Sequence, residues 1–319
     1  MIPVSRRAVL AAAAVAPFAQ AGPKLADGMR FCLNTSTVRH AEGAWGKSRP
    51  ILELIDIAQK AGYAAIEPWV SELDDYEKTG GNLKDLGKRI ADAGLQVPDA
   101  IGFAEWIVED EARRKKGLEQ AKRDMEKVRT IGGVRMAAPP VGATGGASRR
   151  DDPKFTAPVD LFAAADRYRA LFELGQSMGI TPIAEIWGAS KTMSRLGEAV
   201  LIAAEGGCAG CVLPDVYHLY KGGSAFAGLN LLGPAGIGIF HVNDYPKIER
   251  GKIVDQDRVY PGDGVAPLGE VFRTLNAIGY RGFVSLELFN TSYWKQDPLE
   301  VAKTGLAKLK TIADAAMVR

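Results

Sequence analysis

The sequence lacks an excess of charge of either sign, a second long apolar run and any abundance of histidine or cysteine. Its 40 basic and 38 acidic residues give a formal net charge of +2, which falls to 0 if a leader containing Arg6 and Arg7 but no acid is removed. A nearly neutral chain has no electrostatic reason to bind nucleic acid or an anionic membrane. Beyond the first residues, no apolar run is long enough to span a bilayer. The composition therefore argues against nucleic-acid binding and against a membrane span in the mature chain.

The three cysteines are Cys32, Cys208 and Cys211. A lone Cys-x-x-Cys spacing is a weak signal for zinc. An exported protein could oxidise the pair Cys208 and Cys211, but residues three apart on a strand face opposite sides, which disfavours a bridge. We therefore expect the cysteines to be small core residues.

The N-terminus has the pattern of an export signal. Ser5-Arg6-Arg7 precedes the apolar stretch Ala8–Ala16, and Ala19-Gln20-Ala21 follows as a cleavage signal. Paired arginines at this place are typical of the twin-arginine route. We expect residues 1–21 to be a twin-arginine signal peptide and the mature protein to be periplasmic or secreted. An ordinary secretory signal or a disordered tail is the alternative.

Apolar runs of strand type alternate with amphipathic helical stretches through the rest of the chain. We expect strands at Arg30–Thr37, Ala64–Trp69, Gln96–Phe103, Val134–Val141, Ile180–Gly188, Gly210–His218, Gly236–Asp244 and Gly282–Asn290. We expect helices at Pro50–Ala61, Leu83–Ala93, Glu111–Thr130, Pro158–Met178, Thr192–Glu205, Pro267–Ile278 and Pro298–Ala316, and a less certain one within the Gly-rich segment Leu219–Pro234. Eight strands with helices between them predict an α/β fold, the (β/α)8 TIM barrel, as one domain over residues 22–319.

The doubly wound sheet is the rival architecture. It would carry a Gly-rich phosphate-binding turn after its first strand. Asn34-Thr35-Ser36-Thr37 stands at that place instead, which favours the barrel.

Four residues lie near the ends of the last four expected strands: Glu185, Asp215, His241 and Glu287. If these strands are parallel members of a closed barrel, the four side chains converge at its C-terminal mouth. Three carboxylates and one imidazole are suitable ligands for a hard or borderline divalent cation. For Glu185 and Glu287, a structural salt bridge is the alternative, because a buried acid is costly unless it is paired or bound to metal. The sequence thus favours a metal-dependent enzyme.

Two neighbouring residues are candidates for contact with a substrate. His218 lies three residues after Asp215, beyond the strand end, and one of only three histidines in the chain thereby falls in the site. Trp187 shares a strand face with Glu185 by period-two alternation. Its ring could stack on a sugar or fill the barrel.

The strand-end pattern is followed by Arg258-Val-Tyr-Pro261-Gly-Asp-Gly264 and by Gly279-Tyr-Arg-Gly-Phe-Val-Ser-Leu-Glu287. With these motifs the chain resembles the xylose-isomerase-like barrels, the sugar (phosphate) isomerases and epimerases. The resemblance covers the mature chain and is strongest between Glu185 and Glu287. It is specific to the superfamily and poorly specific to a substrate.

The resemblance implies roles for individual residues. Glu185, Asp215, His241 and Glu287 would hold one Mn, Mg, Co or Zn ion, and Glu185 and Glu287 would also be the catalytic acid/base pair. His218 matches the substrate-contacting histidine of the family. Arg258 matches a substrate-binding arginine of the family, and Lys247 could take that place. Glu67 matches a pocket acid, with a salt bridge at the rim as the alternative.

The implied function is a metal-dependent sugar isomerase or epimerase that works through an enediolate. Dehydration or elimination on inososes or 3-keto-glycosides would share the first step, so a dehydratase or lyase is an alternative. A non-catalytic, exported carbohydrate-binding protein is a second one. Ketose 3-epimerases of the family usually carry a second glutamate where this chain has Lys191, which weighs against that substrate class. The expected partner is a small sugar or polyol-derived molecule, and the resemblance leaves room for a homo-oligomer.

Overall fold

The computed structural model describes residues 28–142 and 158–317. The expected signal peptide, residues 1–21, lies outside the described residues.

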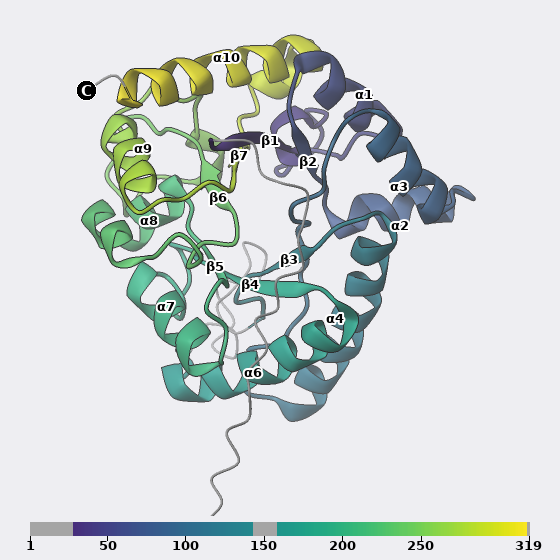
Figure 1. Ribbon diagram of the computed structural model, residues 1–319, viewed down its shortest axis with the longest axis vertical. Helices are drawn as coiled ribbons and strands as arrows, with labels where there is room; N and C mark the ends of the chain where they lie inside the picture. Colours follow the sequence, from purple (N-terminus) through teal and green to yellow (C-terminus); the bar gives the residue numbers. More distant parts are fainter. Residues whose placement is uncertain (1–27, 143–157, 318–319) are drawn as a thin grey trace, which may run out of the picture.

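Parallel strands form the centre of the molecule and helices surround them (Figure 1). The strands are β1 (Arg30–Asn34), β2 (Ala65–Glu67), β3 (Arg135–Ala138), β4 (Thr181–Glu185), β5 (Val212–Leu213), β6 (Phe240–Val242) and β7 (Phe283–Leu286). Hydrogen-bonded pairing gives the orders β2-β1-β7-β6 and β3-β4-β5. Because β7 pairs with β1, the last strand closes onto the first.

Isolated parallel bridges join the two groups of strands into one barrel. Gln96 pairs with Ala65, and Ile101 pairs with Ala137, so the segment between β2 and β3 takes the third place in the barrel. On the other side, Asp215 pairs with His241. The TIM barrel expected from the sequence is confirmed, although the expected third strand contributes single bridges instead of a regular strand.

The helices are α1 (Ile51–Ala61), α2 (Val70–Lys78), α3 (Leu83–Asp92), α4 (Glu111–Thr130), α6 (Leu161–Met178), α7 (Leu196–Glu205), α8 (Val216–Gly222), α9 (Leu268–Ala277) and α10 (Pro298–Met317). Helix α2 is not among the sequence expectations. The uncertain segment Leu219–Pro234 contains the end of α8 and a 3-10 helix at Phe226–Leu231. None of the helices in the described part of the chain is long and apolar enough to cross a membrane.

Glycine ends several helices as the sequence indicates. Gly62 after α1 has a φ of 87° and donates its N–H to carbonyls of the last turn of the helix. Only glycine adopts this left-handed conformation without strain from a Cβ atom. The chain can therefore reverse at once and enter β2.

Cys208 and Cys211 form a disulfide, and their Cα atoms are 5.7 Å apart. Our expectation that they would not be bridged is wrong. Its premise was that both cysteines lie on one strand, but β5 begins only at Val212 and the pair occupies the turn after α7. Cys32 is a buried free thiol in β1, as expected for a core cysteine.

Buried polar side chains gather at the carboxyl end of the barrel. Asn34, Glu67, Asp99, His241 and Ser285 are each fully buried. Burying such groups is costly unless they bind one another or a ligand. Their concentration at one end of the strands therefore marks the candidate functional site.

Candidate metal centre

The barrel brings the four predicted ligands to one end of the strands. Glu185 is the last residue of β4, Asp215 follows β5 by two residues, His241 lies within β6, and Glu287 comes directly after β7. All four side chains are buried. Since the strands are parallel, their carboxyl ends meet at the same mouth, as the sequence predicted.

Three of the four form a tight group. Asp215, His241 and Glu287 each offer one ligand atom, and these atoms lie within 4.8 Å of one another. His241 Nδ1 is 3.3 Å from Glu287 Oε2 and 4.0 Å from Asp215 Oδ2. Among residues 28–142 and 158–317, this buried nitrogen has no hydrogen-bond partner.

Glu185 lies outside that tight group, but the charges of the group affect its pKa. Burial, together with the neighbouring charge of Glu287, raises the pKa of Glu185 to about 8. Its Oε2 atom is also buried and has no hydrogen-bond partner within the described ranges. These two atoms, an imidazole nitrogen and a carboxylate oxygen, lie beside two further carboxylates. Such atoms are suitable ligands for a divalent cation.

Arg258 reaches into the same group. Its Nη1 atom donates to Glu287 Oε2 at 2.7 Å and to Asp215 Oδ2 at 3.2 Å. Burial alone would raise the pKa of Glu287, but the positive charges of His241 and Arg258 outweigh it and hold this pKa below the usual range. Of the two alternatives from the sequence, Arg258 is buried at the site whereas Lys247 is exposed.

The loop that carries Arg258 is anchored on Asp244. Its carboxylate accepts hydrogen bonds from the backbone N–H groups of Tyr245, Gly262, Gly264 and Ala266. A Cβ atom at Gly264 would collide with that carboxylate and with the carbonyl of Tyr245. The Pro-Gly-Asp-Gly motif thus gives the close approach that fixes the loop and places Arg258.

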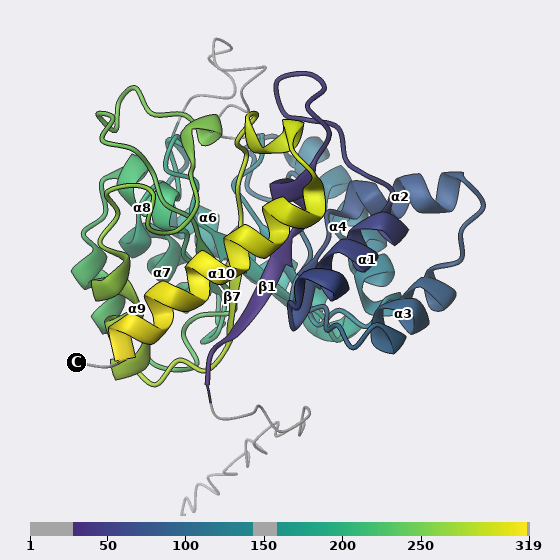
Figure 2. The same cartoon turned by 90° about the horizontal axis from the view of Figure 1, so that it is seen from above.

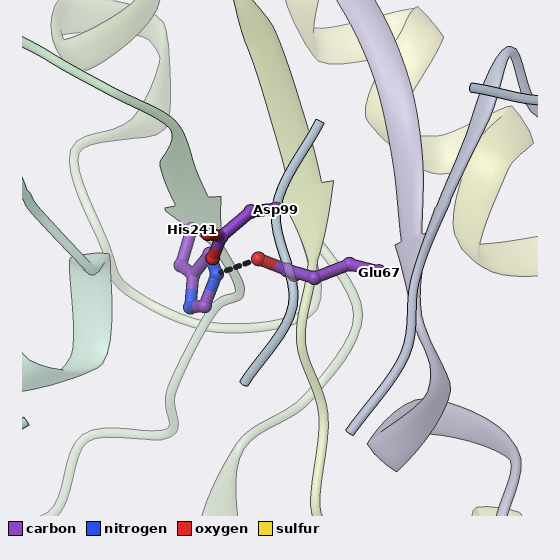
Figure 3. Close-up of side chains that lie close together, drawn as sticks. All are labelled: Glu67, Asp99 and His241. Atoms are coloured by element: carbon purple, nitrogen blue, oxygen red, sulfur yellow. Dashed lines mark hydrogen bonds and ion pairs between the residues drawn. The ribbon is translucent and has the colours of Figure 1, made fainter. Parts of the chain in front are cut away.

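Glu67 and Asp99 lie on the other edge of the His241 ring (Figure 3). Glu67 Oε1 is 2.9 Å from His241 Nε2, and its Oε2 accepts hydrogen bonds from Asn34 and Ser285. Burial opposes the ionised form of Glu67, but His241 lowers its pKa overall. The sequence left Glu67 open between a pocket acid and a rim salt bridge; the structure places it deep in the barrel, against the imidazole.

Asp99 was not a sequence candidate. It is fully buried, and burial together with the charge of Glu67 raises its pKa well above the ordinary value. This direction favours the protonated form of Asp99 beside Glu67. The available signal was an acid directly after Pro98 within the third apolar run, which we read only as a strand.

His218 lies in the first turn of α8, where its backbone N–H donates to Asp215 Oδ1 at 2.7 Å. Burial lowers the pKa of His218 to about 4, so the ring is neutral near pH 7. Gly188 N–H donates to Nδ1 at 3.2 Å. Nε2 in turn lies 3.1 Å from Arg258 Nη2. The His218 ring and the Arg258 guanidinium are therefore in contact at the site.

Trp187 is half-buried beside the centre. Trp187 partly offsets the effect of burial on the pKa of Glu185, and its ring centroid lies 6.3 Å from that of Phe103. The residue therefore lies beside one of the expected ligands.

A closed parallel barrel with carboxylates and imidazoles at its carboxyl mouth defines the class of (β/α)8 enzymes. Within that class, the family model described as xylose isomerase-like TIM barrel matches residues 55–312. The chain belongs to this family, and the resemblance stated from its motifs is confirmed.

Curated and solved relatives agree with this assignment. The inosose isomerase of Bacillus velezensis is 24% identical over 86% of this chain and 94% of its own length. A crystal structure of the IolI protein with a bound zinc atom superposes with a TM-score of 0.77 at 21% identity, covering 91% of this chain and all of its own. The 3-keto-D-glucoside 4-epimerase YcjR from E. coli has a TM-score of 0.68 at 21% identity, covering 89% of this chain and 99% of its own. The expectation of an enzyme of the isomerase and epimerase type is confirmed.

Proposed function

We propose that the protein is a divalent-metal-dependent isomerase or epimerase that moves a proton at a carbon next to a carbonyl group of a sugar or an inosose. The observation that carries this proposal is the convergence of Asp215, His241 and Glu287 within 4.8 Å, with Glu185 beside them. The unpaired His241 Nδ1 and Glu185 Oε2 atoms fit such a cation. Its identity among Mn, Mg, Co and Zn is left to experiment.

A divalent cation held by Glu185, Asp215, His241 and Glu287 would act as a Lewis acid on a carbonyl and its neighbouring hydroxyl group. Glu185 and Glu287 supply the proton transfers. One carboxylate removes the proton from the carbon, and the same group or the other returns it. Return to the opposite face of the same carbon is epimerisation, and return at the neighbouring carbon is isomerisation.

The environment of the two glutamates supports this division of work. Burial and the charge of Glu287 raise the pKa of Glu185 to about 8, whereas His241 and Arg258 hold the pKa of Glu287 low despite its burial. Two carboxyl groups whose pKa values are pushed apart are the usual mark of an acid/base pair. A cation beside them would lower both values.

His218 and Arg258 are proposed to orient the substrate. Both are buried, and the Arg258 guanidinium presents N–H donors beside the neutral His218 ring. Substrate oxygens accept from such donors, and fixed donors need no reorganisation during the reaction. The names of the inosose isomerase and keto-glucoside epimerase relatives suggest keto derivatives of rings as substrates.

The test is carbon-bound hydrogen exchange in D2O. Metal-loaded and metal-stripped protein are incubated with a panel of ketoses, aldoses and inososes, and products are followed by NMR. We expect deuterium at a carbon next to the carbonyl only with the metal-loaded protein. Exchange that survives metal removal would refute the metal dependence. Sugar binding without exchange on any member would favour a carbohydrate-binding protein, and loss of water or of an attached group would favour a dehydratase or lyase.

We also propose that the protein is exported by the twin-arginine route and works in an oxidising compartment. The paired arginines Arg6 and Arg7 support this, as does the disulfide between Cys208 and Cys211, because disulfides persist mainly outside the cytosol. Replacing both arginines with lysine should retain the precursor in the cell, and normal export of that variant would contradict the route.

A further inference from the structure

Five aromatic side chains form a continuous row at the mouth of the barrel. In order of contact they are Trp45, Phe289, Trp69, Phe103 and Trp187, hereafter the aromatic row. Successive ring centroids lie 5.9, 6.1, 4.9 and 6.3 Å apart. These are separations at which aromatic rings contact one another.

One part of the row is bonded to the metal centre. Trp187 follows Glu185, the last residue of β4, by two residues. Trp69 Nε1 donates to Asn34 Oδ1 at 3.1 Å, and Asn34 Nδ2 is 3.3 Å from Glu287 Oε1. A group stacked on the row would therefore be continuous with a sugar held at the centre.

Two members of the row remain open to solvent. Trp45 is 41% exposed and Phe103 is 40% exposed, whereas Phe289 between Trp45 and Trp69 is buried. Single exposed aromatic residues need no explanation, but two exposed rings joined by one continuous row at the mouth of a site indicate a binding surface. Packing of the core does not require these two rings to reach solvent.

The exposed Trp45 is also fixed in place. It lies in a short antiparallel turn closed by hydrogen bonds between His40 and Lys47. Its carbonyl accepts from Arg39 Nη1 at 2.8 Å, and the carbonyl of Ala44 accepts from Gln256. The loop after β1 rises at the same end of the barrel as the loops after β6 and β7 (Figure 2). A ring carried on an anchored backbone loses less conformational entropy on binding than one on a free loop.

Arg39 stiffens the middle of the row. Its guanidinium lies 4.0 Å from the centroid of a Trp69 ring and 5.7 Å from that of Phe289. Such cation–π contacts hold the rings against each other. The row is thus a preformed surface longer than the single sugar ring that the centre needs.

We propose that the aromatic row binds a second ring attached to the reacting sugar, so that the substrate is a keto-sugar glycoside with a ring-shaped aglycone. This inference rests on the proposed function for the reaction at the centre. The aglycone lies along the row between Trp45 and Phe103, its solvent-exposed members. A free monosaccharide leaves these two rings without contact.

The test compares two ligands that differ only in the aglycone. Phenyl and methyl β-D-glucopyranoside are titrated calorimetrically into the full-length protein and into the variants Trp45→Ala, Phe103→Ala and Phe162→Ala. Phe162 lies on α6, is 61% exposed and is absent from the row, so it is the matched control. Because Trp45 and Phe103 are partly exposed, their truncation opens no buried cavity, and Trp45→Phe serves as a conservative rescue.

We expect the wild-type protein and Phe162→Ala to bind the phenyl glycoside about tenfold more tightly than the methyl glycoside. Trp45→Ala and Phe103→Ala should each lose most of that preference, and Trp45→Phe should keep it. Equal affinities in the wild type, no measurable binding of the phenyl glycoside, or an unchanged preference in both alanine variants would overturn the proposal. This titration does not depend on C–H exchange. If exchange is absent but the protein still prefers the phenyl glycoside, only the proposed function is refuted.

Discussion

Glu67 Oε1 lies 2.9 Å from His241 Nε2, on the edge of the ring opposite to Nδ1. The carboxylate therefore holds the imidazole by one nitrogen while the other faces Asp215 and Glu287. In metal sites, a carboxylate in this position fixes the orientation of the histidine and raises its basicity as a ligand.

Glu67→Gln should weaken zinc binding by roughly 10–100-fold without removing a ligand. The amide retains the size of the side chain but loses the negative charge that polarises His241. Competition with a chromophoric chelator measures the affinity, and circular dichroism checks the fold. An affinity equal to that of the wild type would show that Glu67 does not support the histidine.

His218→Ala should keep most of the bound metal and lose turnover. Nδ1 of His218 accepts from Gly188 and Nε2 lies beside Arg258, so neither nitrogen belongs to the tight ligand group. Metal content by elemental analysis is compared with that of His241→Ala, which should lose the ion. If His218→Ala loses the metal as well, His218 is itself a ligand.

Glu185→Gln and Glu287→Gln should each leave a folded protein and reduce C–H exchange by roughly 10²–10⁴-fold. Glutamine keeps an oxygen donor but cannot take up the proton. In an epimerase each glutamate serves one face of the carbon. One of the two variants could therefore still exchange deuterium into the substrate without forming product. Exchange and turnover near the wild-type level in both variants would exclude the acid/base pair, and unfolding of either variant would point to a structural role.

Glu72 should make the folded state less stable as the pH rises. Its buried carboxyl group accepts from Trp69 N–H and Thr35 Oγ1, yet burial raises its pKa from 4.5 to about 7. The folded state therefore binds this proton more tightly than the unfolded chain, and the stabilisation present below pH 4.5 is lost between pH 4.5 and 7. The size is about 3 kcal/mol at 1.36 kcal/mol per pH unit.

The measurement for Glu72 is urea unfolding of the wild type and Glu72→Gln at several pH values. All other groups titrate alike in the two proteins, so their difference in unfolding free energy isolates Glu72. It should change by about 3 kcal/mol across this window, and a pH-independent difference would contradict the raised pKa.

Denatured, unreduced protein should contain one reactive thiol, that of Cys32, because Cys208 and Cys211 are bridged. Reduction before the assay should raise the count to three. Labelling with a thiol-specific chromogenic reagent gives both numbers. Three thiols before reduction, in protein purified from its native compartment, would show that the pair is not oxidised there.

The sequence predicted the barrel and the strand-end residues because both depend on local pattern. The sequence alone shows a buried acid at the end of an apolar run, as at Glu185 and Glu287. It also shows the glycine after α1. Asp99 could not be assigned in the same way, because its role depends on its distance from Glu67, which follows only from barrel closure. The bridge between Cys208 and Cys211 was missed because it depends on where β5 begins.

Each ring of the aromatic row comes from a different connection after a strand or strand segment, whereas Glu185, His241 and Glu287 lie in a strand or directly after one. A replacement at Trp45 leaves the other connections and the barrel in place. Because loops tolerate change that strand ends do not, selection or directed evolution could alter the accepted aglycone one connection at a time. The chemistry at the centre would be inherited while substrate preference diversified around it.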